Sequence, residues 1–159
     1  MGMNTIEELK ERVILIGVST SDGDDTEESL KELKELADTA GAETVGTVIQ
    51  NREAVHPGTY IGKGKIEEVR AMAFGLNATG VICDDELSPA QLNNLEQELD
   101  LKVMDRTLII LDIFAAHART SEGKIQVELA QLKYRQARLV GLRNSLSRLG
   151  GGIGTRGPG

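Results

Sequence analysis

The sequence predicts an α/β fold: a small parallel four-stranded sheet with flanking helices, followed by a long antiparallel α-helical hairpin. Two observations predict this class. In the first hundred residues, short apolar runs alternate with segments whose apolar residues recur at helical spacing, as is typical of parallel sheets covered by crossover helices. From Asp105 onward, one long apolar segment is followed by a seven-residue apolar repeat, which is typical of paired helices.

The strands are predicted from apolar runs that are too short for helices and are bounded by polar or turn-forming residues. Buried strands of parallel sheets have this continuous apolar character because both faces of the sheet are covered. The four runs are VILIGV over 13–18, TVGTVI over 44–49, GVIC over 80–83 and LKVM over 101–104.

Three helices are predicted between these strands. The first begins at Thr26 as N-cap and ends before Gly41, a residue typical of the position after a helix. The second contains the apolar residues spaced over 66–76. The third has a strong start signal, because Ser88 can cap it, a proline follows at the first helical position and Gln91 can reach back to the cap.

The final third is predicted to be a helical hairpin. Asp105 would cap a buried helix, a polar break over 118–124 would contain Gly123, and a second helix would run over 124–147 with its apolar stripe against the first. The last ten residues, GGGIGTRGPG, are too rich in glycine to build a core, and this composition is typical of a linker. We therefore expect an α/β domain over 1–104, a hairpin over 105–148 and a glycine-rich linker over 149–159.

Composition excludes several classes of protein. A single cysteine, Cys83, excludes a disulfide framework and zinc sites built on paired cysteines. No stretch of the sequence has the length and apolar character of a membrane span, and the first residues, MGMNTIEELKER, lack the apolar core of a signal peptide. We therefore expect a cytoplasmic, monomeric protein without a membrane span.

Charge is divided unevenly along the chain. The overall net charge is −7, but residues 1–100 hold 21 acidic and 8 basic residues, a net of −13, whereas residues 101–159 hold 4 acidic and 10 basic ones, a net of +6. No acidic residue follows Glu128. Such asymmetry predicts an acidic body with a basic arm suited to nucleic acid, although a basic solvated helix face would give the same count. The basic helix would present Lys133, Arg135, Arg138 and Arg143.

Motifs with chemical meaning are few. Gly62, Lys63, Gly64 and Lys65 stand at a predicted helix start, where backbone N–H groups and two ammonium groups could hold a phosphate. The segment matches neither GxxxxGK[ST] nor GxGxxG, and glycines that merely ease entry into a helix would look the same.

Acidic residues follow the third predicted strand. Asp84 and Asp85 could bind magnesium at the sheet edge, but a solvated acidic turn is the more common explanation of such a cluster, and we assign no metal site. His56 and His117 have no evident partners, and Cys83 ends an apolar strand as a buried small residue would. No catalytic residue is recognised.

Four stretches together resemble the N-terminal region of the HflX family of ribosome-associated GTPases. They are PGTYIGKGK from Pro57, DDELSPAQLNNLE from Asp84, DRTLIILDIFAAHARTSEGKIQVELAQLKYRQARL from Asp105 and SRLGGGIGTRGPG from Ser147. The third stretch and the glycine segment are the most specific.

The resemblance implies an α/β domain and helical hairpin that precede a GTP-binding domain beyond Gly159, with GTP and Mg as that domain's cofactors and none in this chain. It also implies binding to the rRNA of the large (50S) ribosomal subunit, in ribosome splitting or rescue. On this sequence the rRNA-binding tip would be Arg119, Thr120, Ser121, Glu122, Gly123 and Lys124. Two alternatives stay open: an ATP- or phosphate-binding α/β domain with its own nucleotide-dependent activity, and a hairpin that serves as a protein-docking arm or dimer interface.

Overall fold

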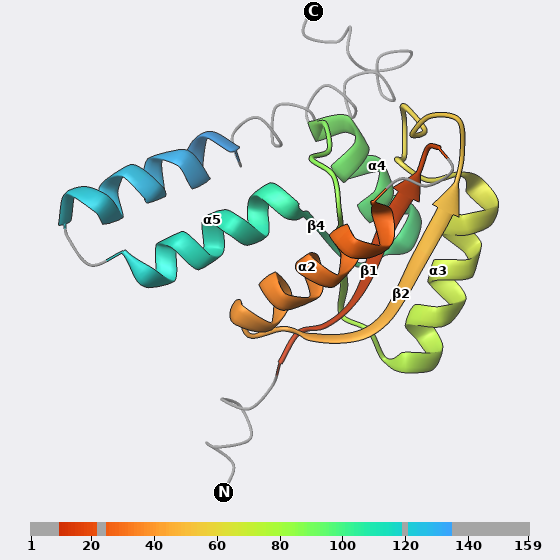
Figure 1. The fold of residues 1–159 in the computed structure, drawn as a ribbon, viewed down its shortest axis with the longest axis horizontal. Helices are drawn as coiled ribbons and strands as arrows, with labels where there is room; N and C mark the ends of the chain where they lie inside the picture. The colour runs from red at the N-terminus through yellow and green to blue at the C-terminus, as the bar shows by residue number, and fades with distance from the viewer. Residues whose placement is uncertain (1–9, 22–24, 119–120, 135–159) are drawn as a thin grey trace, which may run out of the picture.

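The computed structural model describes residues 10–21, 25–118 and 121–134. Its centre is a four-stranded sheet in the order β2-β1-β3-β4, with every neighbouring pair parallel (Figure 1). The four predicted strands and their parallel arrangement are confirmed. Their bounds are β1 Arg12–Ser19, β2 Glu43–Asn51, β3 Gly80–Cys83 and β4 Lys102–Asp105.

The helices between the strands also form where the sequence predicts them. They are α2 Thr26–Thr39, α3 Lys63–Leu76 and α4 Pro89–Leu99; α5 Arg106–His117 follows β4, and a further helix covers residues 121–134. Two predicted caps are confirmed. Ser88 and Gln91 form the reciprocal capping box of α4, and the Asp105 side chain accepts from the backbone N–H of Leu108. The cap of α2 differs, because Asp25 rather than Thr26 occupies that position and makes no side-chain cap bond.

Two apolar layers cover the sheet. Helices α3 and α4 pack on one face, and α2 and α5 pack on the other (Figure 1). Side chains of β1 alternate between the layers: Ile14 and Ile16 belong to the α3–α4 side, whereas Val13 and Leu15 belong to the α2–α5 side. This alternation is the period of two expected of a strand covered on both faces.

The predicted long antiparallel hairpin is wrong. The described residues contain two short helices, 12 residues in α5 and a second one over 121–134, and no long hairpin. Gly123, predicted in a polar break, lies inside the second helix.

The apolar residues do not pair as predicted either. The predicted apolar stripe of the second helix includes Ile125, Leu129 and Leu132, which would have to be buried against a partner helix. Their exposed fractions are instead 57%, 51% and 61%. The physical reason lies in α5. Its buried residues, Leu108 and Ile109, join the α2 layer over the sheet and are therefore turned toward α2.

Candidate functional site

Polar residues that follow the strands meet at the carboxyl end of the sheet, where open α/β sheets bind ligands. Asp105, at the end of β4, is fully buried. Its carboxylate accepts from the backbone N–H groups of Leu87 at 2.8 Å and Leu108 at 3.0 Å, and from the hydroxyl of Tyr134 in a short hydrogen bond. A buried carboxylate with three donors is stabilised in place, and it ties β4, the loop before α4 and the helix over 121–134 together.

Asp84 is held by an ion pair. Its Oδ1 lies 2.9 Å from a guanidinium nitrogen of Arg106, the first residue of α5. The same guanidinium donates to the carbonyl of Ser29 at 2.9 Å and to its Oγ at 3.0 Å, and lies 3.6 Å from Glu32. The strand order reverses between β1 and β3. Ligands of open α/β sheets bind at the carboxyl ends of the strands at such a reversal, and Arg106 occupies this place through its contact with Asp84, just after β3.

Asp85 is engaged by a different partner. The buried Tyr60 hydroxyl donates to Asp85 Oδ2 at 2.6 Å. Burial first, and then this hydrogen bond, raise the pKa of Tyr60 far above its ordinary value. The two carboxylates thus have separate protein partners. Within the described residues there is no group of three or more His, Cys, Asp or Glu side chains that could hold a metal ion.

His56 organises the loop that carries Tyr60. Its Nδ1 accepts from the backbone N–H groups of Gly58 at 3.0 Å and Thr59 at 3.1 Å. Tyr60 itself has a positive φ of 69°, a left-handed conformation that costs a non-glycine residue free energy. Side chains of α4 hold the loop, since Gln91 donates to the carbonyl of His56 and Asn94 to that of Gly58, both at 2.9 Å. These contacts give His56 a structural role.

The segment with the predicted phosphate-binding residues forms the start of α3. Gly62 is the N-cap, and its N–H donates to Gln50 Oε1 at 2.8 Å. Lys63 and Gly64 open the helix, and Lys65 forms an ion pair with Glu68 at 3.1 Å.

The structure adds Arg52 to this segment. A Cβ placed on Gly62 would lie 2.6 Å from Arg52 Nη1, so the guanidinium lies directly beside the cap. Sequence reasoning missed Arg52. Its position just after a strand, at the edge where the following helix begins, was the available signal.

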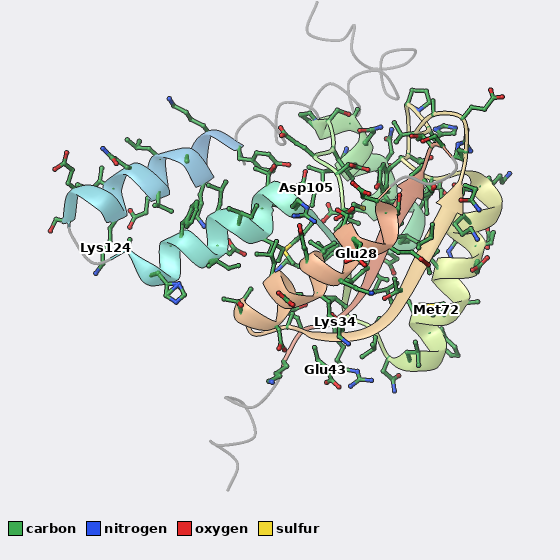
Figure 2. All side chains as sticks on the ribbon, in the orientation of Figure 1. Glu28, Lys34, Glu43, Met72, Asp105 and Lys124 are labelled. Atoms are coloured by element: carbon green, nitrogen blue, oxygen red, sulfur yellow. The ribbon has the colours of Figure 1, made fainter. Side chains whose placement is uncertain are left out.

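The predicted rRNA-binding tip is described in part. Ser121, Glu122, Gly123 and Lys124 begin the helix over 121–134, and Figure 2 shows Lys124 at the end of that helix remote from Asp105 and the sheet. Lys133 lies near its other end. Arg119, Thr120, Arg135, Arg138 and Arg143 lie outside the described residues.

Two further residues are accounted for by packing. Cys83 is completely buried, and that burial raises the pKa of its thiol well above the ordinary range, so it is not poised as a nucleophile. His117 places Nδ1 3.2 Å from the carbonyl oxygen of Ile113 in the last turn of α5. In the described part of the chain, none of the helices has the length and apolar character needed to cross a membrane.

Comparison with known proteins identifies the family. Residues 27–115 match the family model described as GTP-binding GTPase N-terminal, and residues 117–159 match the one described as GTP-binding GTPase Middle Region. The chain is 70% identical to GTPase HflX of Lacrimispora saccharolytica over 97% of its own length and 36% of that relative's. It is 44% identical to GTPase HflX of Escherichia coli over 94% of its length and 35% of that relative's.

Solved structures agree with these matches. A GTP-binding protein from Sulfolobus solfataricus in complex with GDP superposes with a TM-score of 0.63 at 25% identity, covering 84% of this chain and 40% of that one. The chain spans about a third of the length of the curated relatives it matches. The family models, the relatives and the shared fold together place this chain in the HflX family of GTPases, as the N-terminal and middle regions of its members.

Proposed function

We propose that this chain is the ribosome-binding region of an HflX-family GTPase that acts on the large (50S) subunit in ribosome splitting or rescue. In this proposal residues 1–104 form the α/β domain, 105–148 a helical segment and 149–159 a linker to a GTP-binding domain. GTP and Mg belong to that further domain. Family membership supports the assignment to an HflX-family GTPase. The distribution of charge along the sequence supports RNA as the partner.

The two helices that follow β4 carry no net charge of their own. Over 106–117 and 121–134, Arg106, Lys124 and Lys133 are balanced by Asp112, Glu122 and Glu128. The excess positive charge of the final third therefore resides in Arg119 and in the arginines after residue 134. Segments that lack acidic residues attract phosphate without competition from their own carboxylates. We infer that Arg119 and the basic run after 134 make the main RNA contacts.

Co-sedimentation with purified 50S subunits tests the proposal. The wild-type chain should bind, and its affinity should fall steeply between about 50 and 200 mM salt, because neutralised phosphates release counterions. Arg119→Ala with Lys124→Ala should weaken binding at every salt concentration. The matched control is Lys31→Ala with Lys34→Ala, on the exposed side of α2, which should leave binding unchanged. Undiminished binding by the first variant removes the tip from the proposal, and absent wild-type binding removes the ribosome.

A second candidate function rests on the start of α3. Arg52 beside Gly62 adds a third cation to Lys63 and Lys65 at a helix N-terminus, which favours an ATP- or phosphate-binding α/β domain. Isothermal titration with ATP and magnesium should give heat that Arg52→Ala with Lys63→Ala abolishes. If the wild-type chain gives no heat and no change in melting temperature, this candidate is excluded.

A further inference from the structure

The outer edge of β2 offers backbone hydrogen-bonding groups. β2 lies at the end of the sheet order, and no other described strand pairs with it besides β1. Just after the strand, the N–H of Arg52 donates to the carbonyl of Ser19 in β1 at 3.0 Å. Backbone groups of alternate residues point to the same edge of a strand, so those of Gln50 also point toward β1. Those of Thr47, Ile49 and Asn51 consequently point to the open edge.

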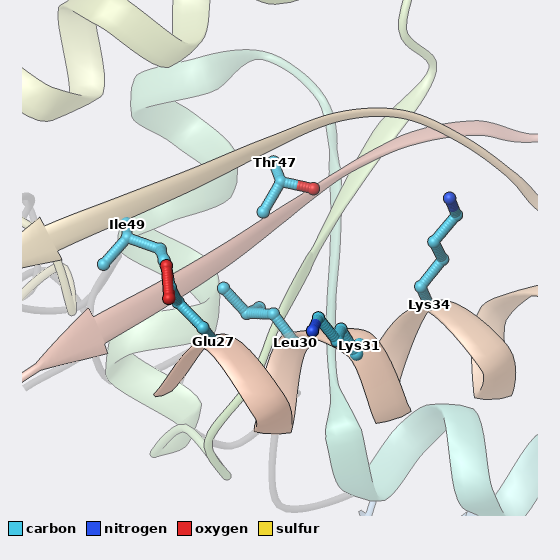
Figure 3. Close-up of a pocket in the computed structure, with 6 residues that line it drawn as sticks. All are labelled: Glu27, Leu30, Lys31, Lys34, Thr47 and Ile49. Carbon is cyan, nitrogen blue, oxygen red and sulfur yellow. The ribbon is translucent and has the colours of Figure 1, made fainter. Parts of the chain in front are cut away.

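A cavity lies beside this edge. It has a volume of about 360 Å³ and is lined by Glu27, Leu30, Lys31 and Lys34 of α2 together with Thr47 and Ile49 of β2 (Figure 3). The two strand residues that line the cavity thus also present their backbone groups to the open edge. A strand added there would direct every second side chain over the cavity, because side chains alternate between the faces of a sheet.

The lining has a definite chemical pattern. Leu30 and Ile49 provide an apolar centre, and Figure 3 shows Glu27 beside Ile49 at one end and Lys34 at the other. Lys31 forms an ion pair with Glu28 at 3.3 Å, whereas Lys34 has no ion-pair partner among the described residues. The complementary occupant carries an apolar side chain and, two positions along the same face, an acidic one.

We propose that the β2 edge binds an extended polypeptide segment by strand addition, with an apolar side chain over Leu30 and Ile49 and an acidic side chain at Lys34. In this mode of recognition the main chain supplies hydrogen bonds and alternate side chains supply specificity.

The β2 edge is separate from the proposed RNA contacts, so peptide binding there can be tested independently of ribosome binding. The probe is a synthetic heptapeptide of threonine with one valine and one glutamate two positions apart. The readout is amide hydrogen exchange measured by NMR on the whole chain. Bound peptide should slow exchange at Thr47, Ile49 and Asn51, while Val48 and Gln50, already paired with β1, serve as internal references.

Two controls separate strand addition from general attraction. A peptide with N-methyl groups along its bonding edge should not protect these amides. Lys34→Glu should weaken the glutamate peptide about fivefold and favour a version with lysine in its place, as expected of a partly exposed charge pair. Lys124→Glu, at the far end of the molecule, should change neither. The proposal is overturned if the three amides are unaffected, if the N-methylated peptide protects them equally, or if they become protected with protein concentration alone.

Discussion

At the scale of single residues, the polar groups at the carboxyl end of the sheet hold the fold together. Asp84 pairs with Arg106, Asp85 accepts from Tyr60, and Asp105 accepts three hydrogen bonds. Considered alone in the sequence, Asp84 and Asp85 resemble metal-binding groups. Buried polar groups require partners, however, and here the protein supplies them. These three carboxylates therefore have structural contacts within the protein.

Asp105 is the most consequential of these residues. Asp105→Ala leaves two backbone N–H groups and the Tyr134 hydroxyl without their acceptor, and it removes the cap of α5. We expect the free energy of unfolding to fall by about 3 kcal/mol. Tyr134→Phe removes one of the three bonds and should cost about 1 kcal/mol. Urea unfolding followed by circular dichroism measures both values. Equal losses in the two variants would show that the amides of Leu87 and Leu108 do not depend on this carboxylate.

The raised pKa values of Cys83 and Tyr60 predict that the folded chain loses stability at alkaline pH. Both pKa values are raised in the folded state, mainly by burial, whereas the unfolded chain has thiol and phenol pKa values of about 8.5 and 10. Their contribution is complete below the unfolded pKa values and declines as pH rises above them, because only the unfolded chain releases these protons. Above its unfolded pKa, each group should lower the free energy of unfolding by up to about 1.4 kcal/mol per pH unit. Unfolding measured from pH 8 to 11 should show this decline.

The variant Tyr60→Phe provides the control for the alkaline prediction. It loses the hydrogen bond to Asp85 at all pH values, yet its slope above about pH 10 should be smaller than that of the wild-type chain, because one titrating group is gone. An unchanged slope would assign the alkaline loss to other groups.

At the scale of helices and strands, local signals set where elements begin. The capping box of α4 joins Ser88 and Gln91 within a single turn, and Asp105 caps α5 in the same way. These starts were predictable because cap and helix are adjacent in sequence. The helix over 121–134 behaves differently. Its more buried side includes Gln131 and Tyr134, which contact Asp112 and Asp105, while Ile125 and Leu132 are exposed.

The cap of α4 allows a direct test. Ser88→Ala should destabilise the chain by about 1 kcal/mol, because the N–H of Gln91 loses its acceptor, and Ser88→Gly should cost only a few tenths. For a chain of this size the alanine variant should melt roughly 2–4 °C lower. Differential scanning calorimetry of the two variants measures the difference, and equal melting temperatures would mean that the hydroxyl contributes nothing to the cap.

At the scale of the whole molecule, charge is segregated. The acidic first hundred residues hold β1 to β3 and helices α2 to α4, while the excess of positive charge belongs to Arg119 and the sequence after residue 134. An acidic body disfavours non-specific contact of the sheet with phosphate, and a basic segment permits contact at one place. This distribution is the reason to expect a directional rather than a diffuse interaction with RNA.

Salt dependence of 50S binding tests that distribution. Replacing Arg135, Arg138 and Arg143 with glutamine should lower the slope of log affinity against log salt by about 2 to 3, since each phosphate contact contributes roughly 0.7 to 0.9. Binding should weaken as well, while Lys31→Gln with Lys34→Gln should alter neither quantity. A slope identical to that of the wild-type chain would place the phosphate contacts elsewhere.

Much of the fold was predictable, and much less of the candidate site. The alternation of apolar runs and helical spacing identified β1 to β4 and α2 to α4, because each signal spans only a few residues. The partners of the polar residues were not predictable. Arg106 meets Ser29 across 77 positions, and Tyr60 meets Asp85 across 25. No local pattern marks such pairs, since they meet only when β1, β3 and β4 lie side by side. Arg52 beside Gly62 is a different case, because its position directly after β2 was a local signal.

The amino-acid sequence alone predicted the class of sheet, the starts of α4 and α5, the family and the division of charge. These features depend on periodicity, capping residues and composition, which are visible within short stretches of sequence. Folding in three dimensions assigned the partners. It placed Leu108 and Ile109 against the α2 layer, left Ile125, Leu129 and Leu132 exposed, and engaged Asp84, Asp85 and Asp105 in structural contacts. Each apolar or polar side chain has more than one surface against which it could be buried or bonded. The partner that it contacts depends on the packing of the whole chain and not on any repeat within the sequence.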